Sequence, residues 1–561
     1  MNRSLQKRTE KALKRSSPQS ILEGLANRSG SQLLNEILEL EDPKGFVRSL
    51  SEVDFYWLIK KVGEDDALPL LELAKVSQWV FILDLELWIR DRIDNNKLCQ
   101  WFNRFLVANP ERFVKMLLTE EGELLASFFA YRNLESIEVT KDETYDVPDD
   151  FITLDGTIYF KPHNDEHLEM FTKMLKYMAM FDFQKYFSFM INYRGILPAE
   201  TEEELYRLRN ARIAEYGFLP FEEAIVVYSP MAPERLISKA EETAILGAKQ
   251  SFNIPFYPLS LIEYRKNLVL QIFKKVPDPI LLDRLRIEFA SLVNHLISLE
   301  PQVPASPDEL MPLVLKAVRH LNLAFERFFV QGEDLLMELL KKHHLITFFR
   351  VGVHMVMKIK WEVESWLKAS WYLKKGLDYT FWGDKWGMAL KGLLRKRPLY
   401  YDPKEEGDFR EFEWISELKN TLEDVNKLMV LNSLLEKLED SLGPFLDLTE
   451  KDFRPFLFTP WARSLLGLEL KTEPLSEIEM KTFFYLIRGK SPRKPYDTLH
   501  KKQEFIEFFL HISKPKSKDV AELLIGALGE IYSDFDAEYK WVAPEDLDPR
   551  FCPHLLVKTQ D

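Results

Sequence analysis

The residues best suited to catalytic chemistry form one short motif, HNDEH, at His163–His167. The pattern H-x-x-E-H is typical of a class of zinc hydrolases, in which both imidazoles bind the metal and the glutamate activates a water molecule. That chemistry needs both histidines on one face of a helix and a third ligand, for which Glu241 or Glu242 is available. The motif therefore makes a zinc-dependent hydrolase one hypothesis for the function.

The same motif also reads as the start of a helix. Pro162 precedes it, and Asn164 or Asp165 suits the N-cap position, where a side-chain oxygen accepts a hydrogen bond from a free backbone amide. His163 would then lie outside the helix, and the two imidazoles would not share a face. We favour this structural interpretation and expect neither a metal nor a cofactor.

A second group combines aromatic and basic side chains between Trp361 and Arg397. Tryptophans interleaved with lysines can stack on bases or line a groove for a partner protein. The three that we select as candidate binding residues are Trp371, Trp382 and Trp386. Packing inside the protein is the alternative, because Trp361, Trp366 and Trp371 are five residues apart, a spacing that distributes side chains around a helix.

A third group lies on a predicted helix at Glu202–Arg212, where Arg207, Arg209 and Arg212 follow a run of glutamates. Glutamates three and four residues before an arginine form ion pairs on a solvated helix. Three arginines so close together could instead bind an anionic partner, so we select them as partner-binding candidates. Their replacement by glutamate is expected to abolish partner capture if this hypothesis is correct.

Composition excludes several classes of protein. The 561 residues are 46% hydrophobic with a net charge of −14, which fits packed domains and disfavours a protein whose main surface binds nucleic acid. Only two cysteines occur, Cys99 and Cys552, which is too few for a fold held together by several disulfide bonds. No G-x-G, G-x-x-x-x-G-K-[ST] or G-x-S-x-G pattern is present, which removes the dinucleotide, phosphate-loop and nucleophile-elbow motifs. No stretch qualifies as a transmembrane segment. We expect a cytoplasmic protein.

The elements that would position these residues are mostly helices. From Phe46 to Asp94, apolar residues recur every three or four positions, and Ser51 and Ser77 stand where N-caps are expected. Short capped helices in series indicate stacked helical hairpins. Residues 151–160 predict a β-hairpin with a two-residue turn at Asp155-Gly156, whereas the acidic residues 136–150 predict a loop.

The sequence therefore predicts a mainly α fold, with a solenoid-like array of helical hairpins, one small β-hairpin and a C-terminal part of long helices. Long helices are expected at 278–299, 307–330, 334–375 and 412–442, and the last twenty residues are expected to dock back on the body. The expected divisions of the chain are 1–20 (a mobile basic tail), 21–135 (the array), 136–250 (mixed), 260–400 (long helices) and 401–561 (C-terminal helices).

Three stretches give the chain a family resemblance: Leu208–Pro230, the elements ALPLLELA and LDLELW in the first array, and PEDLDPRF at Pro544–Phe551. Together they resemble a bacterial family known only as a domain of unknown function, over most of the chain. More loosely, residues 46–94 resemble the helical N-terminal domain of magnesium transporters. The membrane domain and the acidic ion-binding pattern of those transporters have no counterpart here, so transport is not implied.

These patterns favour a non-enzymatic helical scaffold or regulatory protein that binds another macromolecule, with a protein as the expected partner. The zinc hydrolase is one alternative. The other is an accessory protein at nucleic acid or a membrane surface, which would use the basic tail and Arg395–Arg397.

Overall fold

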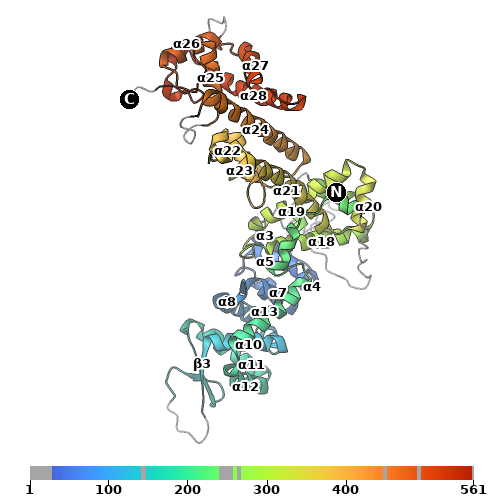
Figure 1. The fold of residues 1–561 in the computed structure, drawn as a ribbon. Coiled ribbons are helices and arrows are strands. Elements are labelled where there is room, and N and C mark those ends of the chain that lie inside the picture. Colours follow the sequence, from blue (N-terminus) through green and yellow to red (C-terminus); the bar gives the residue numbers. More distant parts are fainter. Residues whose placement is uncertain are drawn as a thin grey trace, which may run out of the picture. The chain divides into compact units, whose positions relative to one another are not determined.

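The computed structural model describes residues 28–139, 147–238, 257–261, 267–445, 452–488 and 494–558. These residues form helices with three small sheets, which confirms the predicted mainly α class (Figure 1). The chain divides into two compact units, Met1–Val351 (unit 1) and Gly352–Asp561 (unit 2). The predicted basic tail, 1–20, lies outside the described residues.

The first half of unit 1 is a succession of short helices. Their bounds are α3 (Gly30–Leu38), α4 (Pro43–Ser49), α5 (Glu52–Val62), α6 (Leu68–Leu73), α7 (Val76–Glu86), α8 (Asn95–Ala108), α9 (Pro110–Leu117), α10 (Glu120–Asn133), α11 (Leu168–Phe181), α12 (Phe183–Asn192) and α13 (Pro198–Ala214). Polar side chains set several of the helix starts: Ser51 Oγ accepts from Asp54 N at 3.0 Å, and Thr119 Oγ1 accepts from Gly122 N at 3.2 Å. The predicted cap at Ser77 is wrong, because the N-cap of α7 is Lys75, two residues earlier, and the helix begins at Val76.

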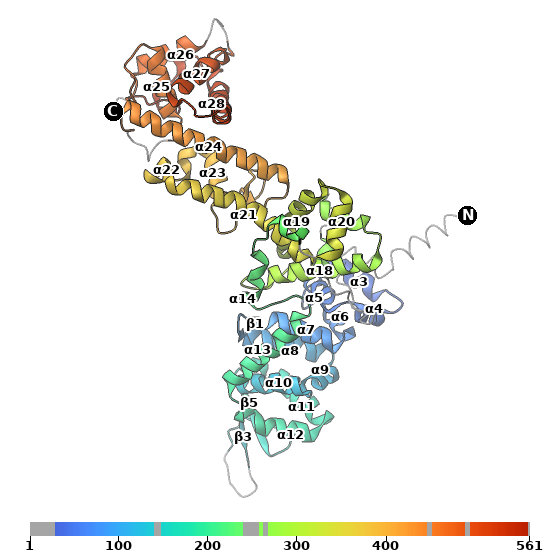
Figure 2. The same ribbon diagram turned by 45° about the vertical axis from the view of Figure 1, so that its right-hand side comes forward.

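These helices pack on their near neighbours in the chain. Contacts join α5 to α7, α6 to α8, α9 to both α10 and α11, and α11 to α12, and α13 returns against α7 and α10 (Figure 2). Helices α9 and α11 bury one apolar face, as the residue spacing predicts, whereas α5 and α7 are buried on nearly all sides. A two-rung hairpin of β1 (Trp88–Ile89) and β2 (Arg92–Ile93) joins α7 to α8, where the sequence indicates only helix.

A three-stranded antiparallel sheet separates α10 from α11. Its strands are β3 (Leu134–Glu138), β4 (Ile152–Thr153) and β5 (Ile158–Pro162), in the order β3-β5-β4. The predicted β4–β5 hairpin is confirmed, but its loop is longer than two residues, because Thr153 pairs with Tyr159. Asp155 Oδ1 accepts from the amides of Thr157 and Ile158, both at 2.8 Å, which stabilises the wider loop.

The second half of unit 1 contains short helices together with long ones. They are α14 (Phe221–Ala224), α15 (Pro233–Ser238), α16 (Tyr257–Ser260), α17 (Leu268–Lys275), α18 (Pro279–Ile297), α19 (Pro307–Phe329), α20 (Glu333–Lys342) and the start of α21 (Leu345–Ala369), of which α18, α19 and α21 are the long helices. Helices α16 and α19 contact α5, so segments far apart in sequence share this core. The expected single helix at 334–375 is wrong: the chain breaks at His343, the C-cap of α20, and restarts at Leu345.

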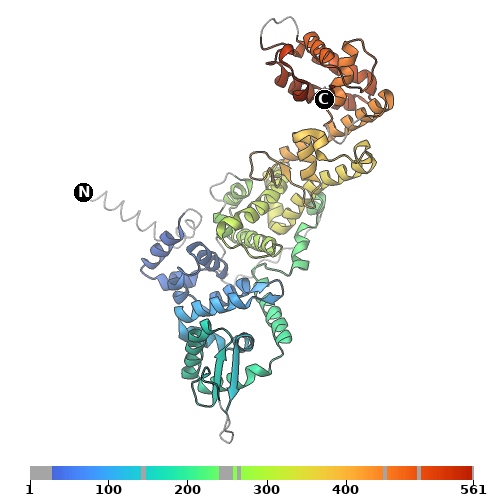
Figure 3. The same cartoon turned by 90° about the vertical axis from the view of Figure 1, so that its left-hand side faces the viewer.

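Unit 2 contains the rest of α21 and seven further helices among the described residues. Its elements are α22 (Trp371–Lys374), α23 (Gly383–Leu393), β6 (Tyr400–Tyr401), β7 (Phe409–Arg410), α24 (Ile415–Leu442), α25 (Pro455–Leu465), α26 (Glu477–Ile487), α27 (Lys502–Ser513) and α28 (Lys518–Tyr539). Helices α24, α27 and α28, the orange and red ribbons of Figure 3, pack together. Helix α25 packs on α27 and α28 through an aromatic cluster. Within that cluster Phe458 stacks on Phe505 and Phe535, with ring centroids 4.9 and 4.4 Å apart.

The C-terminal segment, residues 552–558, completes the core of unit 2. Leu475 N donates to Leu556 O and Lys558 N donates to Leu475 O, both at 2.8 Å. Leu556 N also donates to Thr459 Oγ1 at 2.8 Å. The predicted docking of the chain's last part on the body is therefore confirmed.

His554, in this segment, predicts a pH dependence of stability. Its side chain is fully buried among Phe458, Phe535 and Tyr539. Burial, helped by the nearby charge of Arg454, lowers its pKa from 6.5 to about 3. A histidine whose pKa is lower in the folded state binds its proton first in the unfolded state. The stability that the neutral imidazole contributes is therefore lost as the pH falls from about 6.5 towards 3.

We expect the free energy of unfolding to fall by about 1 kcal/mol per pH unit over that range on account of His554. Other groups titrate there too, including Glu538, so the measurement is a comparison of variants. Urea denaturation at several pH values should give a shallower slope for His554→Gln than for wild type. Replacement of the exposed His500 by glutamine is the control and should keep the slope; equal slopes for both variants would contradict the assignment.

Candidate functional site

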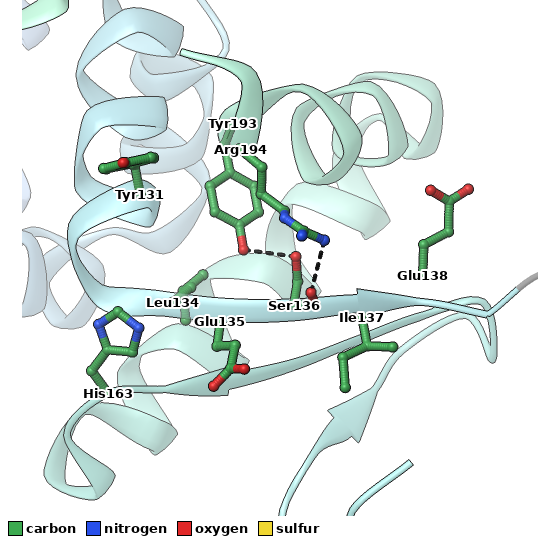
Figure 4. Close-up of a pocket in the computed structure, with 9 residues that line it drawn as sticks. All are labelled: Tyr131, Leu134, Glu135, Ser136, Ile137, Glu138, His163, Tyr193 and Arg194. Carbon is green, nitrogen blue, oxygen red and sulfur yellow. Dashed lines mark hydrogen bonds between the residues drawn. The ribbon is translucent and has the colours of Figure 1, made fainter. Parts of the chain in front are cut away.

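A cavity of about 610 Å³ lies along the outer side of β3 (Figure 4). It is lined by residues from α10, β3, the segment after β5 and the 3₁₀ turn Tyr193–Gly195: Tyr131, Leu134, Glu135, Ser136, Ile137, Glu138, His163, Tyr193 and Arg194. Most of the cavity wall is therefore formed by β3, an edge strand, and Tyr193 and Arg194, which follow α12, lie opposite it.

The backbone of β3 has one paired and one open side. Two hydrogen bonds flank the paired region: Val139 N donates to Thr157 O at 2.9 Å, and His163 N donates to Asn133 O at 2.8 Å. In this register the odd-numbered residues of β3 form the hydrogen bonds to β5. Hydrogen bonds alternate along an antiparallel strand, so the amide and carbonyl groups of Ser136 and Glu138 point to the other side. No strand covers that side among the described residues.

Two side chains from the 3₁₀ turn reach this open edge. Arg194 Nη1 donates to Ser136 O at 2.9 Å, and Tyr193 Oη donates to Ser136 Oγ at 2.7 Å (Figure 4). Burial raises the pKa of Tyr193, so its phenol stays protonated and does not act as a base towards Ser136. The hydrogen bonds from Tyr193 and Arg194 to Ser136 therefore hold β3 against the turn that follows α12. The free backbone groups along the open edge of β3 are suited to pairing with the backbone of another segment.

The histidines of the HNDEH motif do not lie on one helix. His163 follows β5, with its ring near Arg132 O, and Asn164 caps a 3₁₀ turn at Asp165–His167 by accepting from Glu166 N at 3.0 Å. His167 lies 3.7 Å from Cys99 Sγ. The helix-start interpretation is correct. Over the described ranges no three metal-binding side chains converge, and Glu241 and Glu242 lie outside them.

The three candidate arginines of α13 have different surroundings. Arg207 is exposed and paired with Glu204, and it borders a cavity of about 450 Å³. Arg209 Nε donates to Asp84 O at 2.6 Å, and its guanidinium lies over Trp88. Arg212 binds both carboxylate oxygens of Asp84, at 2.7 and 2.9 Å. Two of the three therefore fasten α13 to α7.

The candidate tryptophans lie inside unit 2. Trp371, Trp382 and Trp386 are each at most 5% exposed. Trp371 Nε1 donates to Glu439 at 2.7 Å and Trp386 Nε1 to Asp424 at 3.3 Å, so both join α24 to the preceding helices. All three tryptophans therefore pack inside the protein, which was the alternative to a binding surface. We do not use them in the proposals below.

The basic run Arg395–Arg397 lies after α23. Arg395 stacks over Phe409 at 4.1 Å, and its carbonyl accepts from Lys360 Nζ at 2.7 Å. No helix in the described part of the chain is long and apolar enough to cross a lipid bilayer.

The outer face of α12 is a surface that the sequence analysis did not single out. Phe183 is 53% exposed and Ile191 is 41% exposed, and half-buried Phe187 lies between them on the same face. At the end of α11, Met180 is 73% and Phe181 50% exposed. We call these five residues the α12 stripe. The spacing of four residues in FxxxFxxxI was the signal for it.

Comparisons with known proteins bear on identity alone. Neither a search of curated proteins nor one of solved structures gave a match. Residues 10–558 match the model of a family of unknown function (DUF6178), which agrees with the resemblance seen in the sequence. The chain therefore belongs to this family.

Proposed function

We propose that the protein is a helical scaffold that binds an amphipathic helix of a partner protein through the α12 stripe. The observation that carries this proposal is the full or partial exposure of five apolar side chains between Met180 and Ile191 on one helical hairpin, with Phe183 and Phe187 in ring contact. Large exposed apolar patches rimmed by polar residues are typical of protein–protein interaction sites.

The shape of the stripe favours a helical partner. Phe183, Phe187 and Ile191 recur at four-residue intervals and therefore form a row about 12 Å long on one side of α12. The rings of Phe183 and Phe187 are roughly parallel, with centroids 6.4 Å apart. A row of this length accommodates about two turns of a partner helix with apolar residues at i, i+3/i+4 and i+7.

The rim of the stripe is basic. Lys115 Nζ lies 5.1 Å from the ring of Phe181, and Lys176 is exposed on α11, one turn before Met180. Complementary charge at the rim of an interface raises the association rate and selects the partner. We therefore expect acidic residues beside the apolar face of the partner helix.

The test compares partner capture by variants of the full chain. Phe183→Glu/Ile191→Glu should lower recovery of the partner at least about 10-fold in affinity purification with quantitative mass spectrometry, because anchor residues dominate interface energies. The matched control is Val330→Glu/Ile478→Glu, which places the same charges at two other exposed apolar positions, each 79% exposed. Loss with both variants, or with neither, would refute the proposal.

The same purified protein tests the alternatives from the sequence. Stoichiometric zinc in the wild-type chain that is lost in His167→Ala would favour the hydrolase. Binding to RNA, DNA or acidic vesicles that weakens with salt would favour the accessory protein.

A further inference from the structure

The open edge of β3 offers hydrogen-bonding groups that no described strand uses. The amide of Ser136 and both backbone groups of Glu138 point away from β5, by the alternation established above. Edge strands with free backbone groups bind a further strand readily, and proteins usually cover or blunt them. This edge instead borders a cavity of about 610 Å³.

The cavity has the dimensions and walls that suit an extended peptide. A strand rises about 3.3 Å per residue, so the backbone groups of Ser136 and Glu138 can pair with a peptide segment of about three to four residues. Tyr131, which is 40% exposed, supplies aromatic surface beside the edge. Alternate side chains of a bound strand would face this wall, while its backbone pairs with β3.

The charges at the edge select the kind of peptide. Glu138 is exposed at the end of β3, and the neighbouring Glu135 also lines the cavity. Arg194 is the single guanidinium among the lining residues, and it already donates to Ser136 O. The two carboxylates disfavour an acidic peptide or a nucleic acid and favour lysine or arginine in the added strand.

We propose that the outer edge of β3 binds an extended, basic peptide segment of another protein by strand addition. The bound segment pairs with Glu138 through two backbone hydrogen bonds and with Ser136 through its amide, and its basic side chains approach Glu135 and Glu138. This site is separate from the α12 stripe, and neither proposal depends on the other.

Arg194 has a defined part in this proposal. By donating to Ser136 O it occupies one acceptor of the open edge when no peptide is present, as charged residues do at protected edges. A carbonyl oxygen has two lone pairs, so the arginine can stay in place while a strand pairs at Glu138.

The first test uses a phage-displayed library of random hexapeptides and the full chain. Glu135 and Glu138 lie on opposite faces of β3, so we expect enrichment of sequences with lysine or arginine at two positions three residues apart. Binding of the best synthetic hexapeptide should weaken at least about 10-fold when its alternate backbone amides are N-methylated, because the strand then loses its donors. An acidic consensus, no consensus, or equal binding of the N-methylated peptide would overturn the proposal.

The second test places binding at β3 with a matched pair of variants. Glu138→Pro removes the outward amide and leaves the β3–β5 bonds intact, whereas Glu138→Ala removes only the charge. We expect the proline variant to lose at least about 10-fold in affinity and the alanine variant clearly less. Equal affinities for the wild type and the proline variant would exclude this edge as the site.

Hydrogen exchange with mass spectrometry keeps the test valid if the proline variant folds poorly. In the wild-type chain, the peptide should slow exchange in fragments that contain Ser136 and Glu138. Slowed exchange elsewhere, with these fragments unchanged, would assign the peptide to another site and overturn the proposal.

Discussion

Replacement of Arg212 by alanine is expected to lower the free energy of unfolding of unit 1 by about 3 kcal/mol. The carboxylate of Asp84 is only 6% exposed and binds the Arg212 guanidinium through both oxygens. Burial raises the pKa of Asp84 even with this partner present. Without Arg212 the carboxylate must stay buried with less compensation or take up a proton, and either outcome destabilises the folded state.

Arg207 provides the control for this experiment. Its side chain is 73% exposed, and its pairing with Glu204 lies on the surface of α13. Exposed pairs contribute little, so Arg207→Ala should change the free energy of unfolding by less than about 0.5 kcal/mol. Urea denaturation followed by circular dichroism measures both variants. Similar values for the two would show that the Asp84 contact does not hold α13 to α7.

The difference between Arg212, which binds buried Asp84, and exposed Arg207 changes how the hypothesis that the three arginines bind a partner can be tested. Conversion of all three arginines to glutamate would place a second negative charge beside buried Asp84. Lost partner capture would then report a damaged fold as readily as a damaged surface. Arg207 alone remains suited to a surface test, because its replacement leaves the contacts of Arg209 and Arg212 with α7 unchanged.

The second large effect is expected at Trp382, whose replacement by alanine should cost unit 2 about 3–5 kcal/mol. The indole is 1% exposed and packs against Tyr372, Phe381 and Phe453, with ring centroids between 5.1 and 5.8 Å away. Alanine would leave a cavity among aromatic rings from three different segments of the chain, and those rings cannot collapse fully into it.

Trp361 is the matched control, because it is 43% exposed on α21. Trp361→Ala should cost clearly less than Trp382→Ala, since a large part of the Trp361 side chain stays in contact with water in the folded chain. Thermal and urea unfolding of the two variants gives the comparison. A stable Trp382 variant that has lost a partner would contradict the structural role and restore the sequence hypothesis of a binding residue.

Local patterns in the sequence were enough for most of the helices. Ser51, Thr119 and Asp278 each precede a helix and cap it, and these starts follow from side-chain chemistry within three residues. The break at His343 was missed because apolar periodicity continues across it. The interruption is stabilised from another helix, where Glu288 accepts from Leu345 N at 2.8 Å.

The candidate site was harder to predict, because it depends on pairing between distant residues. The segment Ser136–Glu138 reads as part of an acidic loop, yet it becomes a strand by bonding to β5 more than twenty residues later. The alternation of apolar and polar residues in β3 only weakly indicates a strand, because the segment has five residues and two of them are glutamates, which are uncommon in strands. In the same way, Asp84 and Arg212 lie 128 positions apart, and nothing local joins them.

The docking of residues 552–558 has a consequence for how the protein is made. Unit 1 has its own core and can begin to fold while the ribosome is still translating the rest of the chain. Unit 2 differs, because Leu556 and His554 fill the region around Thr459 and Phe458. Until those late residues emerge from the ribosome, its aromatic cluster stays incomplete. A nascent chain paused before residue 552 would therefore expose apolar surface, which makes it a substrate for chaperones.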